Sequence, residues 1–546
     1  MRSNGRKSTG ILIAAIIFLC FFFSNSAPQT KSSSVNNQKI EELIAESADA
    51  LQTGDFIRAK ASLQKVLSAA PRNVTANTLA GIVYDKENDL PKAEKHFALA
   101  AKLAPNAPET RNNYGAILLR LDRKVEAARE FTASLKANPQ QTSALVNLAQ
   151  IRFAEGNLPV ARQLFEKAKT TAPASDAEIL RSLIAISLGL REKERAAKEF
   201  AEYINALKAK TQMPAASNSI RDTAFGEELF GGGLLDEARQ ELESILSNEK
   251  QNVNALILLS KIFLQQKNIT AAGRLLESAV AGGLDDAKIY LALAEVYEAG
   301  GYPENAIPAM RRAIAKEPKN DFYRSRYGLL LVNSKAPAAA AVRVEEALKE
   351  FPGSASLWFA FGIAQFDNNK IPEAQKAFEK ALSIDSQLTP ALAYLGAVFV
   401  EQARYNDAAR IYEQAIANNE KVALLHYLLG DTLLKMTDVD EKRIEGTLKR
   451  AAELDANLTS AHLTLGRLYV RQARWAEAAV FLERAAKLEP NRAETFYQLG
   501  RVYTRLKRTS ESKAALEKFK QLNDSQKEQK EVDRRELVRR LANVRF

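Results

Sequence analysis

The chain has 546 residues, of which 46% are hydrophobic and 26% charged, and its formal net charge at pH 7 is +11. Its single cysteine, Cys20, excludes an intramolecular disulfide and a thiolate metal site. The positive excess is modest for this length, and the basic residues are not interleaved with aromatic residues over a continuous face, so nucleic acid is not an expected partner.

The N-terminal residues have the pattern of a secretory signal peptide. A basic start precedes an apolar run at residues 11–23, and small residues stand at the −3 and −1 positions for cleavage after Ser26. As a helix this run rises only about 20 Å, short of the roughly 30 Å hydrocarbon core of a membrane. We therefore expect a signal peptide over residues 1–26 and an exported chain, periplasmic or in the cell envelope.

Two alternatives remain for this segment. Residues 11–23 could stay uncleaved as a short membrane anchor, which would be the chain's one contact with a membrane. Cys20 suggests a lipoprotein, but Leu19 occupies the position where lipoprotein signals carry a small residue. The polar residues 27–39 that follow have no apolar face, and we expect them to form a flexible tether.

From about residue 40 onward the sequence repeats with a period of 34 residues. Prolines set the phase, at Pro71, Pro105, Pro139 and Pro173, and again at Pro318 and Pro352. Twelve residues before each proline stands an alanine, and twelve residues earlier again stands a serine, glycine or alanine. A period of this size predicts a solenoid of stacked units, none of which can bury its apolar face alone.

Each unit has the pattern of two helices. In residues 355–388 apolar residues recur at helical spacing, a polar run interrupts them, and Pro372 suits the first turn of a second helix. Gly362 on the first helix and Phe378 on the second predict a close antiparallel contact in which the ring fills the space above the glycine.

The order of these residues resembles the tetratricopeptide repeat (TPR) family. The unit from Thr459 shows most of the family pattern, with Leu465, Gly466, Tyr469, Ala478, Leu482, Ala485 and Pro490. The resemblance implies an all-α, right-handed α-solenoid of about 14 TPR helix-turn-helix repeats over about nine tenths of the chain. Their expected starts lie near residues 40, 74, 108, 142, 177, 219, 253, 287, 321, 355, 389, 423, 459 and 493.

Irregularities divide the array. Linker-like composition near residues 208–219 separates an N-terminal block, residues 40–214 with about five repeats, from a C-terminal block, residues 215–526 with about nine. This break is either a hinge or a change of superhelical pitch. Residues 438–441 lengthen one inter-helix turn by about two residues. Residues 527–546 are expected to form a charged C-terminal capping helix.

Catalytic and metal-binding patterns are not evident. The sequence has no HExxH, GxSxG or GxxxxGK[ST] string, and we expect no enzyme activity, cofactor or metal site. His426 and His462 both stand at place 4 of a repeat, counted from the first residue of its first helix, and His96 stands on a second helix. Place 4 is a packing position in this repeat, so these histidines are interpreted as structural.

Binding is expected on the concave surface, which this family lines with its first helices. Places 5, 9 and 13 form one stripe on each first helix. The apolar and aromatic candidates are Phe359, Ile363, Tyr394 and Tyr427. The C-terminal candidates are Arg467, Arg471, Arg501 and Arg505, with Tyr497 beside them. This arrangement suits an extended peptide with an acidic group or free carboxylate at one end. Alternatively these arginines are ordinary solvent-exposed side chains, which the helix dipole favours near helix C-termini.

Two asparagines complete the candidate set. Asn113 and Asn147 both stand at place 6, and they resemble a fragment of the asparagine ladder of sugar-transferase TPR arrays. The sequence thus predicts a non-enzymatic scaffold that binds partner proteins or peptides, some of them acidic, in cell-envelope assembly or secretion. The alternative is a carbohydrate-handling scaffold in polysaccharide export, with an anionic polysaccharide as ligand.

Overall fold

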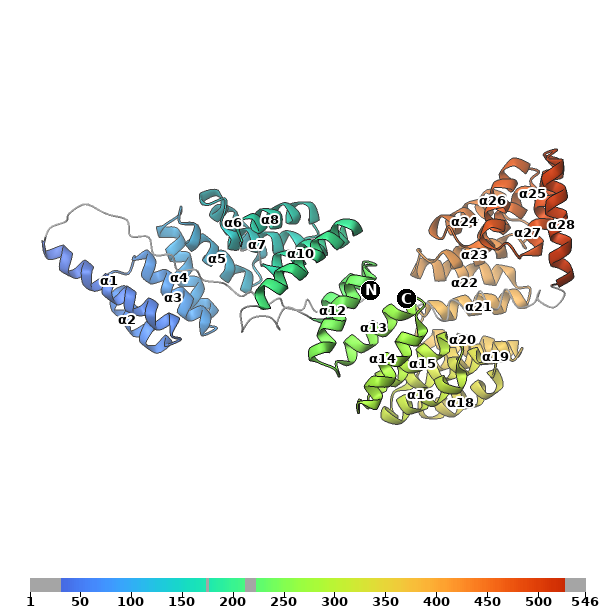
Figure 1. Cartoon of the computed structure of the whole chain (residues 1–546), viewed down its shortest axis with the longest axis horizontal. Coiled ribbons are helices and arrows are strands. Elements are labelled where there is room, and N and C mark those ends of the chain that lie inside the picture. The colour runs from blue at the N-terminus through green and yellow to red at the C-terminus, as the bar shows by residue number, and fades with distance from the viewer. Residues whose placement is uncertain (1–30, 173–175, 212–221, 526–546) are drawn as a thin grey trace. The chain divides into compact units, whose positions relative to one another are not determined.

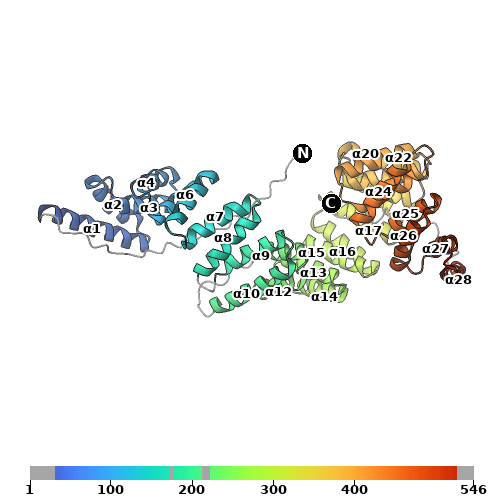
Figure 2. The same cartoon turned by 90° about the horizontal axis from the view of Figure 1, so that it is seen from above.

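The computed structural model describes residues 31–172, 176–211 and 222–525. Within them 28 α-helices follow one another and no strand occurs. In both views the helices form antiparallel pairs, the first and second helix of each repeat (Figure 1, Figure 2). The predicted all-α repeat fold and the predicted number of repeats are confirmed. All but two of the predicted repeat starts coincide with the first residue of a helix.

The odd-numbered helices are the first helices of their repeats. They are α1 (Lys31–Gln52), α3 (Val74–Lys86), α5 (Pro108–Arg120), α7 (Thr142–Ala154), α9 (Ala177–Gly189), α11 (Thr223–Gly231), α13 (Val253–Gln265), α15 (Ala287–Ala299), α17 (Asp321–Asn333), α19 (Ala355–Asp367), α21 (Thr389–Glu401), α23 (Ala423–Leu433), α25 (Thr459–Arg471) and α27 (Ala493–Arg505).

The even-numbered helices are the second helices. They are α2 (Phe56–Ala69), α4 (Leu90–Leu103), α6 (Lys124–Ala137), α8 (Leu158–Thr171), α10 (Lys193–Thr211), α12 (Leu235–Asn248), α14 (Ile269–Ala281), α16 (Pro303–Lys316), α18 (Pro337–Glu350), α20 (Ile371–Ile384), α22 (Tyr405–Asn418), α24 (Glu441–Leu454), α26 (Trp475–Leu488) and α28 (Thr509–Ser525).

In most pairs a small residue at place 8 of the first helix faces a large one near place 24 on the second helix. A Cβ added to Gly362 would come within 2.5 Å of the Phe378 ring, and one added to Gly396 within 2.5 Å of Tyr412. Both rings are fully buried. The glycines therefore let the two helices approach closely enough for a ring to cover the backbone, as the sequence predicts for Gly362.

The turn between the two helices has a recurring backbone conformation. In the repeat of α19 and α20, Asn369 has φ 60°, and the Lys370 N–H donates to the Gln365 carbonyl at 2.9 Å. A left-handed residue with such a bond is the usual way to satisfy the free carbonyls at a helix end. Positive φ recurs at the equivalent position of most repeats, on alanine, lysine and arginine as well as on glycine.

Place 4 has a structural role that the histidines share with other residue types. His426 Nε2 lies 2.8 Å from the Glu420 carbonyl oxygen, and His462 Nε2 lies 3.0 Å from that of Ala456. Trp358 donates its indole N–H to the Pro352 carbonyl at 2.9 Å in the same way. Each side chain ties a first helix to the turn before it, which confirms the structural interpretation of the two histidines.

The chain divides into two compact units, residues 1–262 and 263–546. This division does not coincide with the predicted boundary at 214/215. Within the first unit, packing continues from one side of residues 212–221 to the other, because the Phe225 ring of α11 packs edge-on against Tyr203 of α10 at 5.2 Å. Arg181 of α9 also forms an ion pair with Asp222 at 2.9 Å.

The ends of the array differ partly from expectation. The predicted tether, residues 27–39, is helical from Lys31 onward, because a helix once formed extends at little cost into adjacent polar residues.

The lengthened turn predicted at residues 438–441 is confirmed, since α24 begins two residues later in its repeat than α20 does. The predicted signal peptide and C-terminal capping helix lie outside the described residues. No helix of the described ranges is long and apolar enough to cross a membrane.

Candidate functional site

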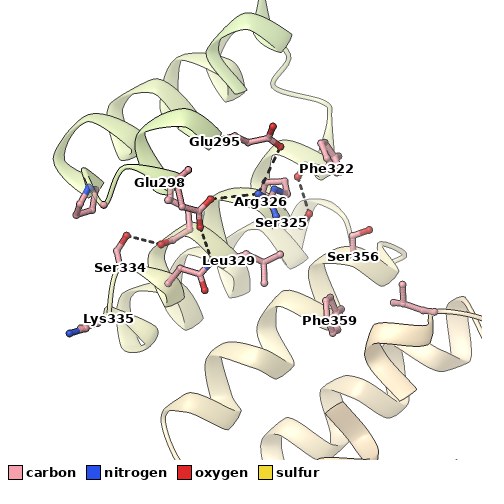
Figure 3. Close-up of a pocket in the computed structure, with 16 residues that line it drawn as sticks. Glu295, Glu298, Phe322, Ser325, Arg326, Leu329, Ser334, Lys335, Ser356 and Phe359 are labelled. Carbon is pink, nitrogen blue, oxygen red and sulfur yellow. Dashed lines mark hydrogen bonds and ion pairs between the residues drawn. The ribbon is translucent and has the colours of Figure 1, made fainter. Parts of the chain in front are cut away.

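A groove of about 830 Å³ opens on the first helices of the second unit (Figure 3). Its walls come from α15, α17 and α19 and from the turns beside them. The residues that line it are Glu295, Glu298, Ala299, Gly301, Pro303, Phe322, Ser325, Arg326, Leu329, Leu330, Asn333, Ser334, Lys335, Ser356, Phe359 and Leu388. This groove is the main candidate for a binding site.

The polar centre of the groove is one guanidinium between two carboxylates. Arg326 Nη2 lies 4.0 Å from Glu295 Oε1 and 3.7 Å from Glu298 Oε2, and Figure 3 shows the three side chains converging. Asn333 holds Glu298 in place by donating its amide N–H to Oε1 at 2.7 Å. The Arg326 Nε is buried and has no hydrogen-bond partner within the described structure. This nitrogen is covered by the chain and is not open to a ligand, so the groove's accessible polar groups are the Arg326 Nη atoms and the two carboxylates.

The apolar part of the groove lies beside this centre. The Phe322 side chain is 47% exposed, although aromatic side chains gain free energy from burial. Leu329 and Phe359 form a largely buried floor. Lys335 also lines the groove, but Figure 3 shows its side chain directed away from the Arg326 cluster. The groove thus offers an apolar surface next to a charged one.

A second candidate surface lies on the last two first helices, α25 and α27. Arg467 and Arg471 are exposed, as predicted, but each has a carboxylate partner. Arg467 pairs with Glu494 at 3.3 Å, and Arg471 pairs with Glu441 at 3.0 Å. Their charges are therefore partly neutralised within the chain.

The other two arginines of this surface have aromatic neighbours instead. The Arg501 guanidinium carbon lies 5.8 Å from the centre of the Tyr497 ring, and that of Arg505 lies 5.7 Å from the Trp475 ring. Neither forms an ion pair with any residue that the structure describes. Tyr497 is 41% exposed. Arg501 and Arg505 are thus the predicted cations best placed to meet a negative charge from outside.

Three predicted groove residues are instead part of the core. Phe359 is 6% exposed, Ile363 1% and Tyr394 0%. The Tyr394 ring packs against Phe359 at 5.7 Å and against Phe378 at 5.4 Å, which joins successive repeats. The expected aromatic trough is therefore corrected, because neighbouring helices approach closely enough to cover these positions. Of the three, only Phe359 lines the groove, through its small exposed fraction.

The remaining candidates lie in partly covered positions. Tyr427 is half-buried and packs beside Ala451, Leu458 and Ala461. Asn147 is buried, and its amide donates to Asn112 at 3.3 Å rather than to Asn113, which is half-buried. A ladder running through place 6 is therefore not formed by direct contact between Asn113 and Asn147.

The sequence analysis missed the charged centre of the groove. Glu295 stands at place 9 of its repeat and Arg326 at place 6 of the next, so the pair becomes visible only when adjacent repeats are compared. A signal was available, since place 6 holds alanine in the repeats on either side, at Ala292 and Ala360. In the described ranges no group of three or more His, Cys, Asp or Glu residues could hold a metal ion.

Comparison with known proteins supports the repeat assignment. Models of the tetratricopeptide repeat match residues 45–108, 115–178, 229–296, 287–320, 326–389, 395–443 and 493–526, which together exceed half of the chain. Superkiller complex protein 3 of Mus musculus is 25% identical over 257 residues, which are 44% of this chain but only 16% of the mouse protein.

Solved structures give similarities of the same kind. Yeast Tom70 has 17% sequence identity and a TM-score of 0.39, covering 76% of this chain and 92% of its own. YrrB, described as a TPR protein with an unusual peptide-binding site, has 23% identity and a TM-score of 0.29, covering 37% of this chain and 98% of its own. From the repeat models and the 14 observed helix pairs, this chain belongs to the tetratricopeptide repeat family.

Proposed function

We propose that this chain is a non-enzymatic scaffold that binds partner polypeptides on its first helices. The groove of α15, α17 and α19 is the observation that supports it most directly. It presents an exposed phenylalanine, Phe322, beside the charged side chains of Arg326 and Glu298. An extended polypeptide carries both a backbone carbonyl acceptor and apolar side chains, and so fits such a surface.

The C-terminal arginine surface supports a second point of contact. Arg501 and Arg505 lie on the same helix, α27, and each guanidinium stands near an aromatic ring. A carboxylate of the partner would gain charge-assisted hydrogen bonds there without displacing a carboxylate of this chain. The proposed partner therefore carries an acidic side chain or a free C-terminus at this end.

The proposed setting is the cell envelope, where the scaffold would act in assembly or secretion of an envelope component. This part of the proposal rests on the sequence of residues 1–26, which has the pattern of an export signal.

The test is crosslinking and capture from fractionated cells that express the full chain. The wild type is compared with a variant in which four arginines are changed to glutamate: Arg467, Arg471, Arg501 and Arg505. A matched control makes the same charge change at exposed positions of second helices, at Lys376, Lys380, Lys442 and Lys513. Fractionation also shows whether the chain is in the envelope, and a cytoplasmic chain would contradict the proposed setting.

Envelope proteins that are lost with the arginine variant but kept with the control would support the scaffold and its C-terminal contact. The same proteins captured by all three chains would remove the arginines from the binding surface. Capture dominated by glycan, with no protein lost, would contradict the protein scaffold and favour a polysaccharide-binding role.

A further inference from the structure

The second helices of the first four repeats are more basic than those of the second unit. Together α2, α4, α6 and α8 hold twelve lysines and arginines and only four glutamates. The even-numbered helices from α14 to α28 hold eighteen lysines and arginines and seventeen carboxylates. A cationic excess confined to one stretch of the array points to an anionic partner for that stretch.

Half of the twelve cations already have a carboxylate partner within the chain. Those that form ion pairs are Arg58, Lys60, Lys92, Lys124, Arg162 and Lys169. The four glutamates of these helices are paired as well, with Arg111, Arg123 and Arg195. The charges of these groups are therefore balanced inside the protein.

The other six cations form no ion pair with a residue that the structure describes. They are Lys65, Lys95, Lys102, Arg129, Lys136 and Lys167. Lys65 attracts Glu46 and Arg129 attracts Glu126, but only at longer range than an ion pair. The positive excess of the four helices is thus carried by these six side chains.

The six cations lie on one face of their helices. The second, sixth, tenth and thirteenth residues of an α-helix share a face, and in α2, α4, α6 and α8 these positions hold all six cations and no carboxylate. We call these positions the outer stripe. Each second helix packs against the first helix of its own repeat and that of the next, so this face is left open, and all six cations are exposed.

The outer stripe also carries exposed apolar side chains. Ile57 is 80% exposed and Val125 is 65% exposed. Pro91 and Pro159, also exposed, occupy the same position in α4 and α8, so the stripe begins with an apolar residue on each of the four helices. Aliphatic side chains this exposed gain free energy when a partner removes them from water.

The outer stripe ends after the fourth repeat. The same positions of α10 hold two carboxylates, Glu194 and Glu202, beside one cation, Lys198. In α12 they hold Asp236 and no cation. The combination of unpaired cations and exposed aliphatic residues is therefore confined to α2, α4, α6 and α8 within the first unit.

An anionic lipid surface fits both features of the stripe. Its headgroups attract lysine and arginine, and its interface takes up aliphatic side chains. Protein interfaces and single-stranded nucleic acid sites are enriched in aromatic residues, and the outer stripe has none. A soluble polysaccharide would meet the cations but would leave Ile57 and Val125 in water. Five of the six cations are lysines, compact charges that need no fixed bidentate acceptor.

We propose that the outer stripe of α2, α4, α6 and α8 binds the surface of a membrane that contains anionic lipid. The six cations meet the headgroup phosphates, and Ile57 and Val125 enter the interface. This contact is separate from any anchoring by residues 11–23. It goes beyond the scaffold function, because it concerns where the first unit is held and leaves the first helices open to a partner polypeptide.

The test measures cosedimentation of the purified full chain with lipid vesicles. Every chain carries I13D/I17D, because charges within the apolar run prevent residues 11–23 from inserting. Vesicles of equal parts phosphatidylglycerol and phosphatidylcholine should bind the chain, less strongly as salt is added. Pure phosphatidylcholine vesicles should bind it at least about tenfold more weakly. Equal binding to both kinds of vesicle would overturn the proposal.

Two matched lysine variants test the stripe. K65Q/K95Q/K136Q/K167Q removes one unpaired lysine from each helix and should weaken binding to the phosphatidylglycerol vesicles at least about tenfold. The control, K60Q/K92Q/K124Q/K169Q, makes the same charge change on the same four helices, at lysines that have carboxylate partners, and should have a much smaller effect. Equal weakening would show that only net charge matters and would overturn the stripe.

The apolar contact separates lipid from other polyanions. I57S/V125S should weaken binding to the same vesicles about tenfold. V342S/V480S, which changes two exposed valines of the second unit, should leave it unchanged. If I57S/V125S binds like the wild type, the stripe attracts polyanions in general and the choice of lipid is wrong. Polygalacturonate, a polyanion without an apolar part, should then displace the vesicles.

An environment-sensitive dye locates the contact on the chain. In a C20S background the dye is attached at A61C, in the outer stripe of α2, and its emission should shift to the blue on phosphatidylglycerol vesicles. The same dye at A154C, exposed on the first helix α7, should not shift. Equal shifts would mean that the first unit meets lipid by another face, which would overturn the proposal. The scaffold would be unaffected, since the capture experiment tests the first helices.

Discussion

The middle and the end of the second unit use the same repeat in different ways. Place 5 is Phe359 in the middle, where it is 6% exposed, and Tyr497 at the end, where it is 41% exposed. Place 24 shows the same difference in exposure: Phe378 in the middle is fully buried, whereas Leu516 of α28 at the end is 40% exposed. Burial in a stacked array is supplied by the next repeat, so the same position is core in one repeat and surface in another.

The two regions also differ in how their charges are arranged. In the middle, Glu295 and Glu298 both lie near the Arg326 guanidinium, next to the exposed Phe322 ring. At the end, Arg501 and Arg505 stand against aromatic rings. The chain's two tryptophans report on these regions separately, since Trp358 lies in α19 and Trp475 lies in α26. Single-tryptophan variants, W475F and W358F, therefore allow each region to be followed alone.

The largest expected difference concerns place 5. Phe359→Ala leaves a cavity beside Tyr394 and Phe378 and should lower the free energy of unfolding of the middle region by about 3–5 kcal/mol. Tyr497→Ala removes an exposed ring and should cost under about 1 kcal/mol in the end region. Urea unfolding followed by the fluorescence of Trp358 measures the cost of Phe359→Ala, and that of Trp475 measures the cost of Tyr497→Ala. Similar costs would show that Phe359 is more accessible in solution than its burial indicates.

A smaller difference is expected at the two glycines of place 8. Gly362→Ala places a methyl group 2.5 Å from the Phe378 ring, which Tyr394 holds in position, and should cost about 1–3 kcal/mol. In Gly466→Ala the nearest atoms belong to the flexible Leu482 side chain, also at 2.5 Å. Leu482 is buried and must also shift, but an aliphatic chain deforms more readily than a ring, and alanine favours the helix by about 1 kcal/mol over glycine, so this variant should cost less than Gly362→Ala. The same two fluorescence reporters measure the costs, and a greater loss for Gly466→Ala would contradict this account of the packing.

The repeat itself could be predicted from the sequence because it depends on local spacing. The pairing of Gly362 with Phe378 follows from two helices and a short turn, and it is confirmed. The direction of a side chain on its helix also follows from spacing. The distance to the next repeat does not, and for that reason Phe359, Ile363 and Tyr394 were predicted on the surface but lie in the core.

The charged centre of the groove could not be found by examining one repeat at a time. Glu295 and Glu298 belong to α15, and Arg326 belongs to α17. Their encounter depends on how far one first helix is displaced along the next, which the period of the sequence does not specify. The partners of Arg467 and Arg471 were missed for the same reason, because Glu494 and Glu441 also belong to neighbouring repeats.

Binding should distinguish the two pairs of arginines at the end of the unit. A labelled Gly/Ser peptide that carries Leu-Glu-Leu-Glu should bind the full chain at this surface, and R501E/R505E should weaken its binding about tenfold. R467E/R471E should weaken it less, because Arg467 and Arg471 are already neutralised in part by Glu494 and Glu441. Anisotropy titrations at one salt concentration compare them. Equal losses would mean that the peptide responds to total charge rather than to the two unpaired arginines.

The last expected effect is a loss of folding stability at acidic pH, confined to the end region. Burial alone would raise the pKa of Glu445, but hydrogen bonds from Lys449, Arg474 and Tyr469 outweigh it and lower the pKa to about 2. Because the folded pKa lies below the ordinary value, the stabilisation is fully present above about pH 4.5 and is lost as pH falls toward 2.

Trp475 is the reporter for this loss, since it follows Arg474, whose guanidinium donates to Glu445 at 2.7 Å. The urea midpoint measured through Trp475 should therefore fall between pH 5 and pH 3, and E445Q should flatten this fall while lowering the midpoint at neutral pH. An E445Q chain with the wild-type acid dependence would show that another carboxylate controls it. The ion-pair network of α24–α26 would then contribute to packing alone, and the end region would differ from the middle only in its exposed arginines.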